Sequence, residues 1–188
     1  MRDAVYESFL LGAREDAERI GAESDAVRLV AAPRSGSPPA VYHGLLSGAA
    51  HFVRDAAGIR VSADPIPFTL QFPGDYLRSA DPDLQFRVVF VHAPLVHPNC
   101  RGGLVCLGPG FRPGTRLRAL VEQAYGILAS RVFAPDHALD PEARDFFLHH
   151  IEEVRRLRAS PLWRRPLAAR VRVEPIPAER LAAQEGRA

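Results

Sequence analysis

The spacing of the apolar residues changes partway along this chain of 188 residues, and no other feature constrains its fold as strongly. In "PFTLQFP" an apolar side chain occupies every second position from Phe68 to Phe72, which is typical of a strand with one buried face. "LQFRVVFVHA", residues 84–93, has apolar residues at consecutive positions and predicts a strand buried on both faces, or nearly so. Beyond residue 116 the apolar residues recur every three or four positions, as on one side of a helix. The chain therefore combines strands with helices.

Three helices and one group of strands are predicted. Residues 3–21 have the pattern of an amphipathic helix, and residues 41–92, after a turn-rich break, predict a four-stranded antiparallel meander. A second helix lies within residues 114–133, where six apolar residues share one face: Leu117, Leu120, Val121, Ala124, Ile127 and Leu128. A third runs from about residue 141 to 158, with Asp140 as its N-cap and Pro141 in its first turn. Consecutive strands with segregated helices define an α+β fold.

The domain organisation follows from composition. Residues 1–158 are predicted to form one domain, and residues 159–188 a Pro/Arg-rich C-terminal extension. Through Trp163 and "VRVEPIP" (residues 171–177) this extension either packs on the domain or adds a strand to a partner protein. Packing on the domain is the favoured prediction.

Charge and cysteine usage exclude several classes of partner. The 24 basic residues are interleaved with 22 acidic ones, so no nucleic-acid-binding face is expected. No run approaches the roughly 20 apolar residues of a membrane span, and acidic residues interrupt the first apolar stretch, unlike in a secretory signal. Two cysteines are too few for a disulfide framework, which favours a reducing cytoplasm. All 24 basic residues are arginine and none is lysine, as a GC-rich genome favours.

Both cysteines lie in "HPNCRGGLVCLG", residues 97–108, for which several interpretations are open. His97, Cys100 and Cys106, with His92 as a fourth ligand, could bind zinc, although the spacing supplies neither of the usual ligand pairs. A disulfide could join the two cysteines across the Gly-Gly turn. Each cysteine could also be a small buried apolar residue. The preferred prediction is that the protein binds neither a metal nor a cofactor.

Further motifs surround this segment in a characteristic order. They are "FPGDY" at 72–76, "FRVVFVHAPLVHPN" at 86–99, "GLVCLG" at 103–108, "FRP" at 111–113 and "FAPDHALDPEARDFF" at 133–147. Together they resemble the ubiquitin-conjugating (E2) enzyme family, whose members show F-P-x-x-Y-P, H-P-N, G-x-(I/V)-C-L and W-x-P segments in this order. The resemblance implies an E2 (UBC-like) fold over roughly residues 3–158.

The resemblance implies a function and a set of site residues. Cys106 would accept a ubiquitin-like protein as a thioester from an E1-like activating enzyme and pass it to an amine on a protein substrate. Asn99 would donate to the oxyanion of the transfer step or lock the loop, and His97 would organise that loop rather than act as a base. Asp136, in preference to His137 or Asp140, would orient the incoming amine. Cys100 would be a loop-packing thiol.

Departures from the family pattern refine this expectation. The interval from His97 to Cys106 is one residue shorter than usual, Phe111 replaces the usual Trp, and Leu77 replaces the Pro after the Tyr. Such trimmed loops resemble the E2-like proteins of bacterial ubiquitin-like conjugation operons, which implies a role in antiphage defence. Two alternatives stay open, namely a non-catalytic E2-fold module that binds ubiquitin-like proteins, and a small metal or redox protein. For an enzyme, the absence of lysine would remove side-chain amines that could be self-modified.

Overall fold

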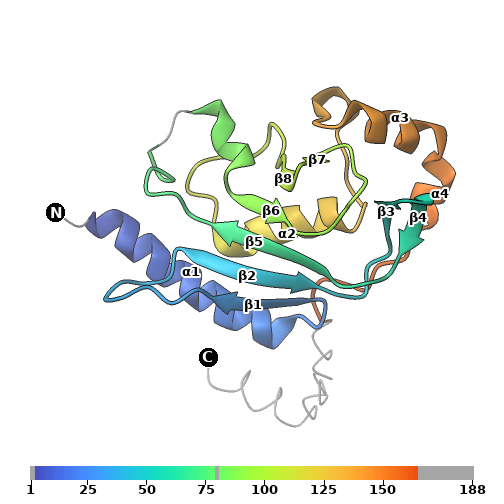
Figure 1. Cartoon of the computed structure of the whole chain (residues 1–188). Helices are drawn as coiled ribbons and strands as arrows, with labels where there is room; N and C mark the ends of the chain where they lie inside the picture. The colour runs from blue at the N-terminus through green and yellow to red at the C-terminus, as the bar shows by residue number, and fades with distance from the viewer. Residues whose placement is uncertain (1–2, 79–80, 165–188) are drawn as a thin grey trace, which may run out of the picture.

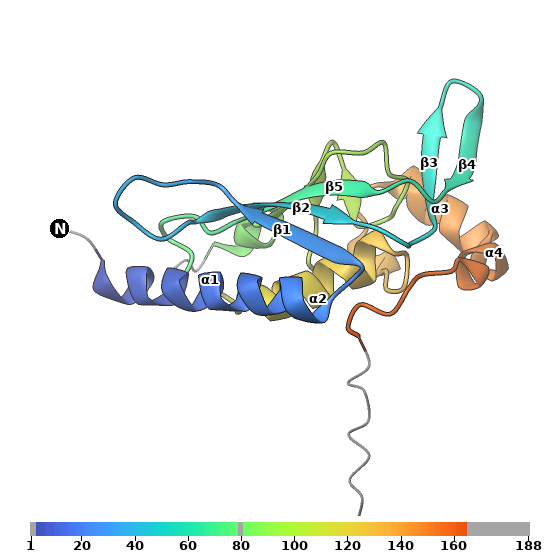
Figure 2. The ribbon, with the colours of Figure 1, turned by 90° about the horizontal axis from the view of Figure 1, so that it is seen from below.

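An antiparallel sheet covered on one face by helices forms the centre of the molecule (Figures 1 and 2). The computed structural model describes residues 3–78 and 81–164. In this part of the chain the fold is α+β, with an N-terminal helix, the sheet, and further helices toward the C-terminus. The predicted fold class is therefore confirmed at this level. None of the helices in the described ranges is long and apolar enough to cross a membrane.

Helix α1, Ala4–Glu23, is the predicted N-terminal helix. The Asp3 side chain caps it by accepting hydrogen bonds from the backbone N–H groups of Val5 and Tyr6. One face of the helix is buried against the sheet and α2, as Figure 2 shows, and includes Leu10 and Ile20. The sequence pattern therefore located the helix. The apolar face that it predicted, Val5, Phe9, Ala13, Ala17 and Ile20, is only partly the buried one, because Val5 is 67% exposed while Tyr6, Leu10 and Asp16 are buried.

The main sheet contains six strands in the described residues, in the order β1-β2-β5-β6-β8-β7, and all neighbours are antiparallel. The strands are β1 (Val27–Ala31), β2 (Val41–Leu46), β5 (Ile66–Gln71), β6 (Val89–Val91), β7 (Cys100–Arg101) and β8 (Leu104–Val105). Leu70 in β5 pairs with Tyr42 on one side and Val89 on the other, and all three are fully buried. These residues belong to the main core, which lies between the sheet and α1 and α2.

The predicted meander of residues 41–92 is only partly correct. The run of neighbouring strands starts earlier, at β1, while β3 (His51–Asp55) and β4 (Gly58–Ser62) leave the sheet as a separate hairpin (Figure 1). Strand β1 lacked a clear alternating pattern because it is an edge strand in which Val30 is 67% exposed. The first half of the predicted strand at 84–93 is instead the 3-10 helix η1, Pro82–Phe86, which Asp81 caps.

The remaining helices are α2 (Leu117–Leu128), the 3-10 turn η2 (Pro135–His137), α3 (Pro141–His149) and α4 (Ile151–Arg156). The whole predicted face of α2 is buried in the core. Asp140 caps α3 as predicted, accepting from the N–H of Ala143. The single helix predicted for 141–158 is wrong, because the chain turns at His150 between α3 and α4. This turn lets Phe147 of α3 and Val154 of α4 enter one small second core with Phe52 of β3.

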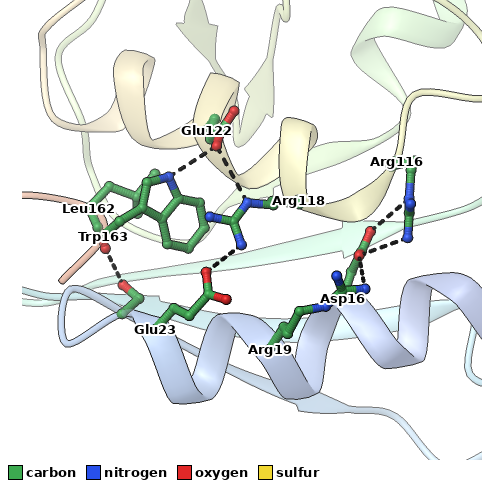
Figure 3. A network of polar contacts seen from close by, with 9 residues as sticks. Asp16, Arg19, Glu23, Arg116, Arg118, Glu122, Leu162 and Trp163 are labelled. Atoms are coloured by element: carbon green, nitrogen blue, oxygen red, sulfur yellow. Dashed lines mark hydrogen bonds and ion pairs between the residues drawn. The ribbon is translucent and has the colours of Figure 1, made fainter. Parts of the chain in front are cut away.

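The start of the predicted C-terminal extension packs on the domain. Residues 158–164, called here the strap, first form backbone hydrogen bonds with residues 48–50 and then reach α1 and α2, where Figure 3 shows Leu162 and Trp163. Ser24 Oγ donates to the Leu162 carbonyl at 2.6 Å, and Trp163 Nε1 donates to Glu122 at 3.0 Å. The Arg118 guanidinium lies 4.0 Å from the centre of the Trp163 ring, a cation–π contact. Packing is thus confirmed for these residues, whereas "VRVEPIP" lies outside the described residues.

Candidate functional site

A tight hairpin brings the two ends of the "HPNCRGGLVCLG" segment together. Strands β7 and β8 pair across Gly102 and Gly103, whose φ angles of 58° and 84° are those that glycine adopts readily. Directly after β8, the Cys106 N–H donates to the Asn99 carbonyl at 2.8 Å. The H-P-N residues and Cys106 are therefore neighbours in space.

His97 is an internal support of this loop. Its ring is fully buried and packs edge to face on Phe147, with 5.1 Å between the ring centroids. Nδ1 accepts the backbone N–H of Asn99 at 3.0 Å, so the proton of the neutral ring lies on Nε2. Burial lowers the pKa of His97 to about 3, an effect that the backbone of Val132 only partly opposes. A ring that stays neutral and points inward is suited to organising the loop and is a poor general base.

Asn99 connects the loop to the thiol. It is buried, and its Oδ1 accepts the backbone N–H of Ala134 at 3.1 Å. Because this bond occupies the amide oxygen, the amide NH₂ remains the end of the side chain that can donate, and the Asn99 side chain acts to lower the pKa of Cys106. Of the predicted site residues, His97, Asn99 and Cys106 are thus brought together.

Cys106 is buried, and only 3% of the residue is exposed to solvent. Burial raises the pKa of the thiol, while hydrogen bonds from the Gly108 backbone and the Asn99 side chain oppose the shift. Sγ also donates to Gln85 Oε1 at 3.6 Å, a normal length for a hydrogen bond from sulfur. Sequence reasoning missed Gln85, which belongs to η1 and has no motif around it.

A pocket adjoins these groups. It has a volume of ≈ 300 Å³ and lies between η1 and the segment after Cys106. Its lining includes Gln85 and Gly108, which both interact with the thiol, as well as Asp81, Phe111 and Arg112. Cys106 itself does not line the pocket, so Gln85 and Gly108 are the residues that connect the pocket to the thiol.

The segment around Asp136 lies beside the same loop. The Pro98 carbonyl accepts the N–H groups of Leu139 and Asp140, at 2.8 and 3.1 Å. Asp136 itself, in η2, is exposed, and its side chain has no hydrogen bond or ion pair among the described residues. The structure thus brings its segment, but not its carboxylate, into contact with the site.

The other interpretations of the two cysteines are tested by the same geometry. Both are free and buried, with Cys100 in β7, and burial strongly raises the pKa of the Cys100 thiol. Within the described ranges, no three or more His, Cys, Asp or Glu side chains are grouped so that they could hold a metal ion. Cys100 is accordingly a packed apolar side chain next to the loop.

Comparison of the chain with models of known protein families and with curated proteins finds no match. Chemically, the site offers one thiol, an acceptor on it from Gln85, the nearby Asn99 side chain, which lowers the thiol pKa, and an adjacent pocket. Such a set suits acyl transfer through sulfur, in which a thiol becomes a thioester and a fixed N–H donor stabilises an oxyanion.

Proposed function

We propose that the protein is an E2-like conjugating enzyme that carries a ubiquitin-like protein as a thioester on Cys106. The observation that carries the proposal is the hydrogen bond that the Cys106 N–H donates to the Asn99 carbonyl at 2.8 Å. It joins the H-P-N motif to the cysteine of the "GLVCLG" segment. The order of elements supports it, since a helix, an antiparallel sheet, this loop and then helices follow one another as the family resemblance implies.

Two acyl transfers would make up the reaction. In the first, Sγ of Cys106 attacks the thioester on an E1-like enzyme, its proton leaves, and the E1 thiol is released. In the second, an amine of a protein substrate attacks the Cys106 thioester, loses a proton, and frees the Cys106 thiol. Each passes through a tetrahedral oxyanion near the Asn99 amide, and one such donor contributes on the order of 2.7 to 4 kcal/mol in other acyl-transfer enzymes.

The raised pKa of Cys106 is compatible with this role, because the E1 thioester is itself reactive and needs no strongly activated thiolate. Asp136 is our candidate for orienting the amine, since its segment is tied to Pro98. By resemblance to bacterial conjugation operons, we propose a cytoplasmic role in antiphage defence.

The test is a charging reaction with the E1-like enzyme and the ubiquitin-like protein from the same genome, with ATP, followed by a gel without reducing agent. We expect an adduct that reducing agent removes. Cys106→Ser should abolish this adduct, and Cys100→Ser, the matched control, should retain it. An E1 that is visibly charged but passes nothing to the wild-type protein would refute the proposal.

A second candidate is a non-catalytic module of the same fold, and the burial of Cys106 favours it. Such a module would bind the free ubiquitin-like protein in the same experiment without forming an adduct. Its affinity would be unchanged by Cys106→Ser, whereas the enzyme gains a covalent bond only through that sulfur.

A further inference from the structure

Gln85 reaches the reactive sulfur from an element that no motif marks. It lies in η1, which is held by Asp81 as its cap and by the fully buried Leu84. Its Nε2 donates to the Pro82 carbonyl at 3.0 Å, which leaves Oε1 as the end of the amide that meets Sγ at 3.6 Å. One side chain is thus fixed at both ends, by its own helix and by the thiol.

We propose that Gln85 is a positioning residue that holds Cys106 as a protonated thiol, oriented at the edge of the adjacent pocket. The biological meaning of this role rests on the proposed function, but the contact itself concerns only this chain. The hydrogen bond requires the proton on sulfur. It therefore exists in the free enzyme and is lost when the thiol becomes a thioester.

Gln85 and Asn99 act on the thiol in opposite directions. An acceptor oxygen such as Gln85 Oε1 stabilises S–H and disfavours the thiolate, whereas N–H donors such as those of Asn99 and Gly108 stabilise the thiolate. Cys100 is the titratable neighbour of Cys106, and it is buried and neutral. Asp81 and Arg112 line the pocket, but among the described residues no charged side chain is one of the groups that shift the pKa of Cys106. Burial is the largest influence on the Cys106 pKa, and these uncharged hydrogen-bonding groups adjust the fraction of thiolate around the value that burial sets.

The test measures alkylation of the full-length protein by iodoacetamide as a function of pH, without any partner. Trypsin cuts after Arg87, Arg101 and Arg116, so the two cysteines fall on separate peptides, 88–101 and 102–116, which mass spectrometry can follow independently. The variants are Gln85→Met, which keeps the shape and removes the acceptor, and Gln85→Glu, which keeps an acceptor and adds negative charge. Gln71→Met and Gln71→Glu are the matched controls, because Gln71 donates to the Arg87 carbonyl at the surface.

Gln85→Met should raise the Cys106 alkylation rate at pH 7.5 by about threefold to tenfold and move the midpoint of the pH profile down, as expected for a shift of about half a unit to one unit. Gln85→Glu should lower the rate and move the midpoint up. The Gln71 variants should match wild type. Midpoints of both Gln85 variants that stay at the wild-type value, or that move in the same direction, would overturn the proposal, because loosened packing alone affects access alike in both.

The two proposals fail separately. Opposite midpoint shifts without any E1-dependent adduct would leave the role of Gln85 standing and remove the conjugating function. An E1-dependent adduct on Cys106 without any midpoint shift would support the conjugating function and remove the proposed role of Gln85.

Discussion

At the scale of single residues, the site depends on side chains that stay uncharged inside the protein. His97 is the clearest case, because its ring is sealed between Phe147 and the Asn99 backbone. The loop holds the His97 ring in its neutral form, so protonation of the ring destabilises the folded state. This makes the stability of the loop sensitive to acid.

The pH dependence of stability tests this arrangement. The unfolded chain binds a proton at His97 near pH 6.5, whereas the folded protein has a pKa of about 3 there, so acid favours the unfolded state below pH 6.5. Between pH 7 and pH 5, His97 should remove about 2 kcal/mol from the free energy of unfolding, and the loss should continue toward pH 3. His51, whose pKa burial also lowers, adds to it in the same direction.

Urea unfolding at pH 7 and pH 5 measures this loss. The variant His97→Gln should be less stable than wild type at pH 7 but should lose less on acidification. His51→Gln is the control for a buried histidine outside the site. An equal loss for wild type and His97→Gln would contradict the assignment of the acid sensitivity to His97.

Motifs predicted the site only where its residues are close in sequence. The approach of Asn99 to Cys106 was expected from the H-P-N and "GLVCLG" segments, and a Gly-Gly turn closes the loop between them. Gln85 is 21 residues from Cys106 and lies in a segment predicted as a strand. Its contact depends on η1, whose position is fixed only by tertiary packing, so the sequence pattern could not reveal it.

At the scale of elements, the strap joins segments that are far apart in the sequence. Figure 3 shows it against the end of α1 and against α2, where Arg118 lies between Trp163 and Glu23. Ser24 is the centre of this junction. Its buried Oγ donates to Leu162 and accepts the N–H groups of Ala26 and Val27.

Removing this hydroxyl should destabilise the protein. Ser24→Ala leaves the Leu162 carbonyl and two buried N–H groups without their partner, which should lower the free energy of unfolding by about 1 to 3 kcal/mol. Chemical denaturation at pH 7 measures the change. Ser35→Ala, at an exposed position between β1 and β2, should stay within about 0.5 kcal/mol of wild type. A Ser24→Ala protein as stable as the Ser35→Ala control would show that the strap is not held there.

Elements were predictable where burial repeats at regular intervals. The six apolar residues of α2 match its buried face, and the alternating residues from Phe68 to Phe72 are all buried, although Thr69 on the other face of β5 is buried as well. Strand β1 was not predicted, because an edge strand needs few buried residues. The turn at His150 was not predicted because no glycine or proline marks it, and the packing of α3 and α4 in the second core is a tertiary contact.

At the scale of the whole molecule, the two cores meet at the candidate site. The main core lies under the sheet, and the second core joins the β3–β4 hairpin to α3 and α4. His97 contacts Phe147 of the second core, while Cys100 belongs to the main core. The motif loop therefore depends on both cores for its shape.

The complete absence of lysine is also a property of the whole molecule. Under the proposed function, a thioester on Cys106 would have no side-chain amine of its own chain within reach. Arg112→Lys places an amine at the pocket beside the thiol, and Arg14→Lys places one on α1. Helix α1 packs along β1, at the opposite edge of the sheet from β7, so Arg14→Lys is the distant control.

In the charging reaction, Arg112→Lys should form a self-conjugate that survives reducing agent, because aminolysis of the thioester gives an amide. Wild type and Arg14→Lys should form only the reducible adduct, apart from modification at the N-terminal amine. Adding Cys106→Ser to Arg112→Lys should abolish the self-conjugate, since the acyl group must pass through sulfur. If Arg112→Lys forms the full thioester adduct but no self-conjugate, the absence of lysine does not prevent self-modification and the hypothesis is wrong.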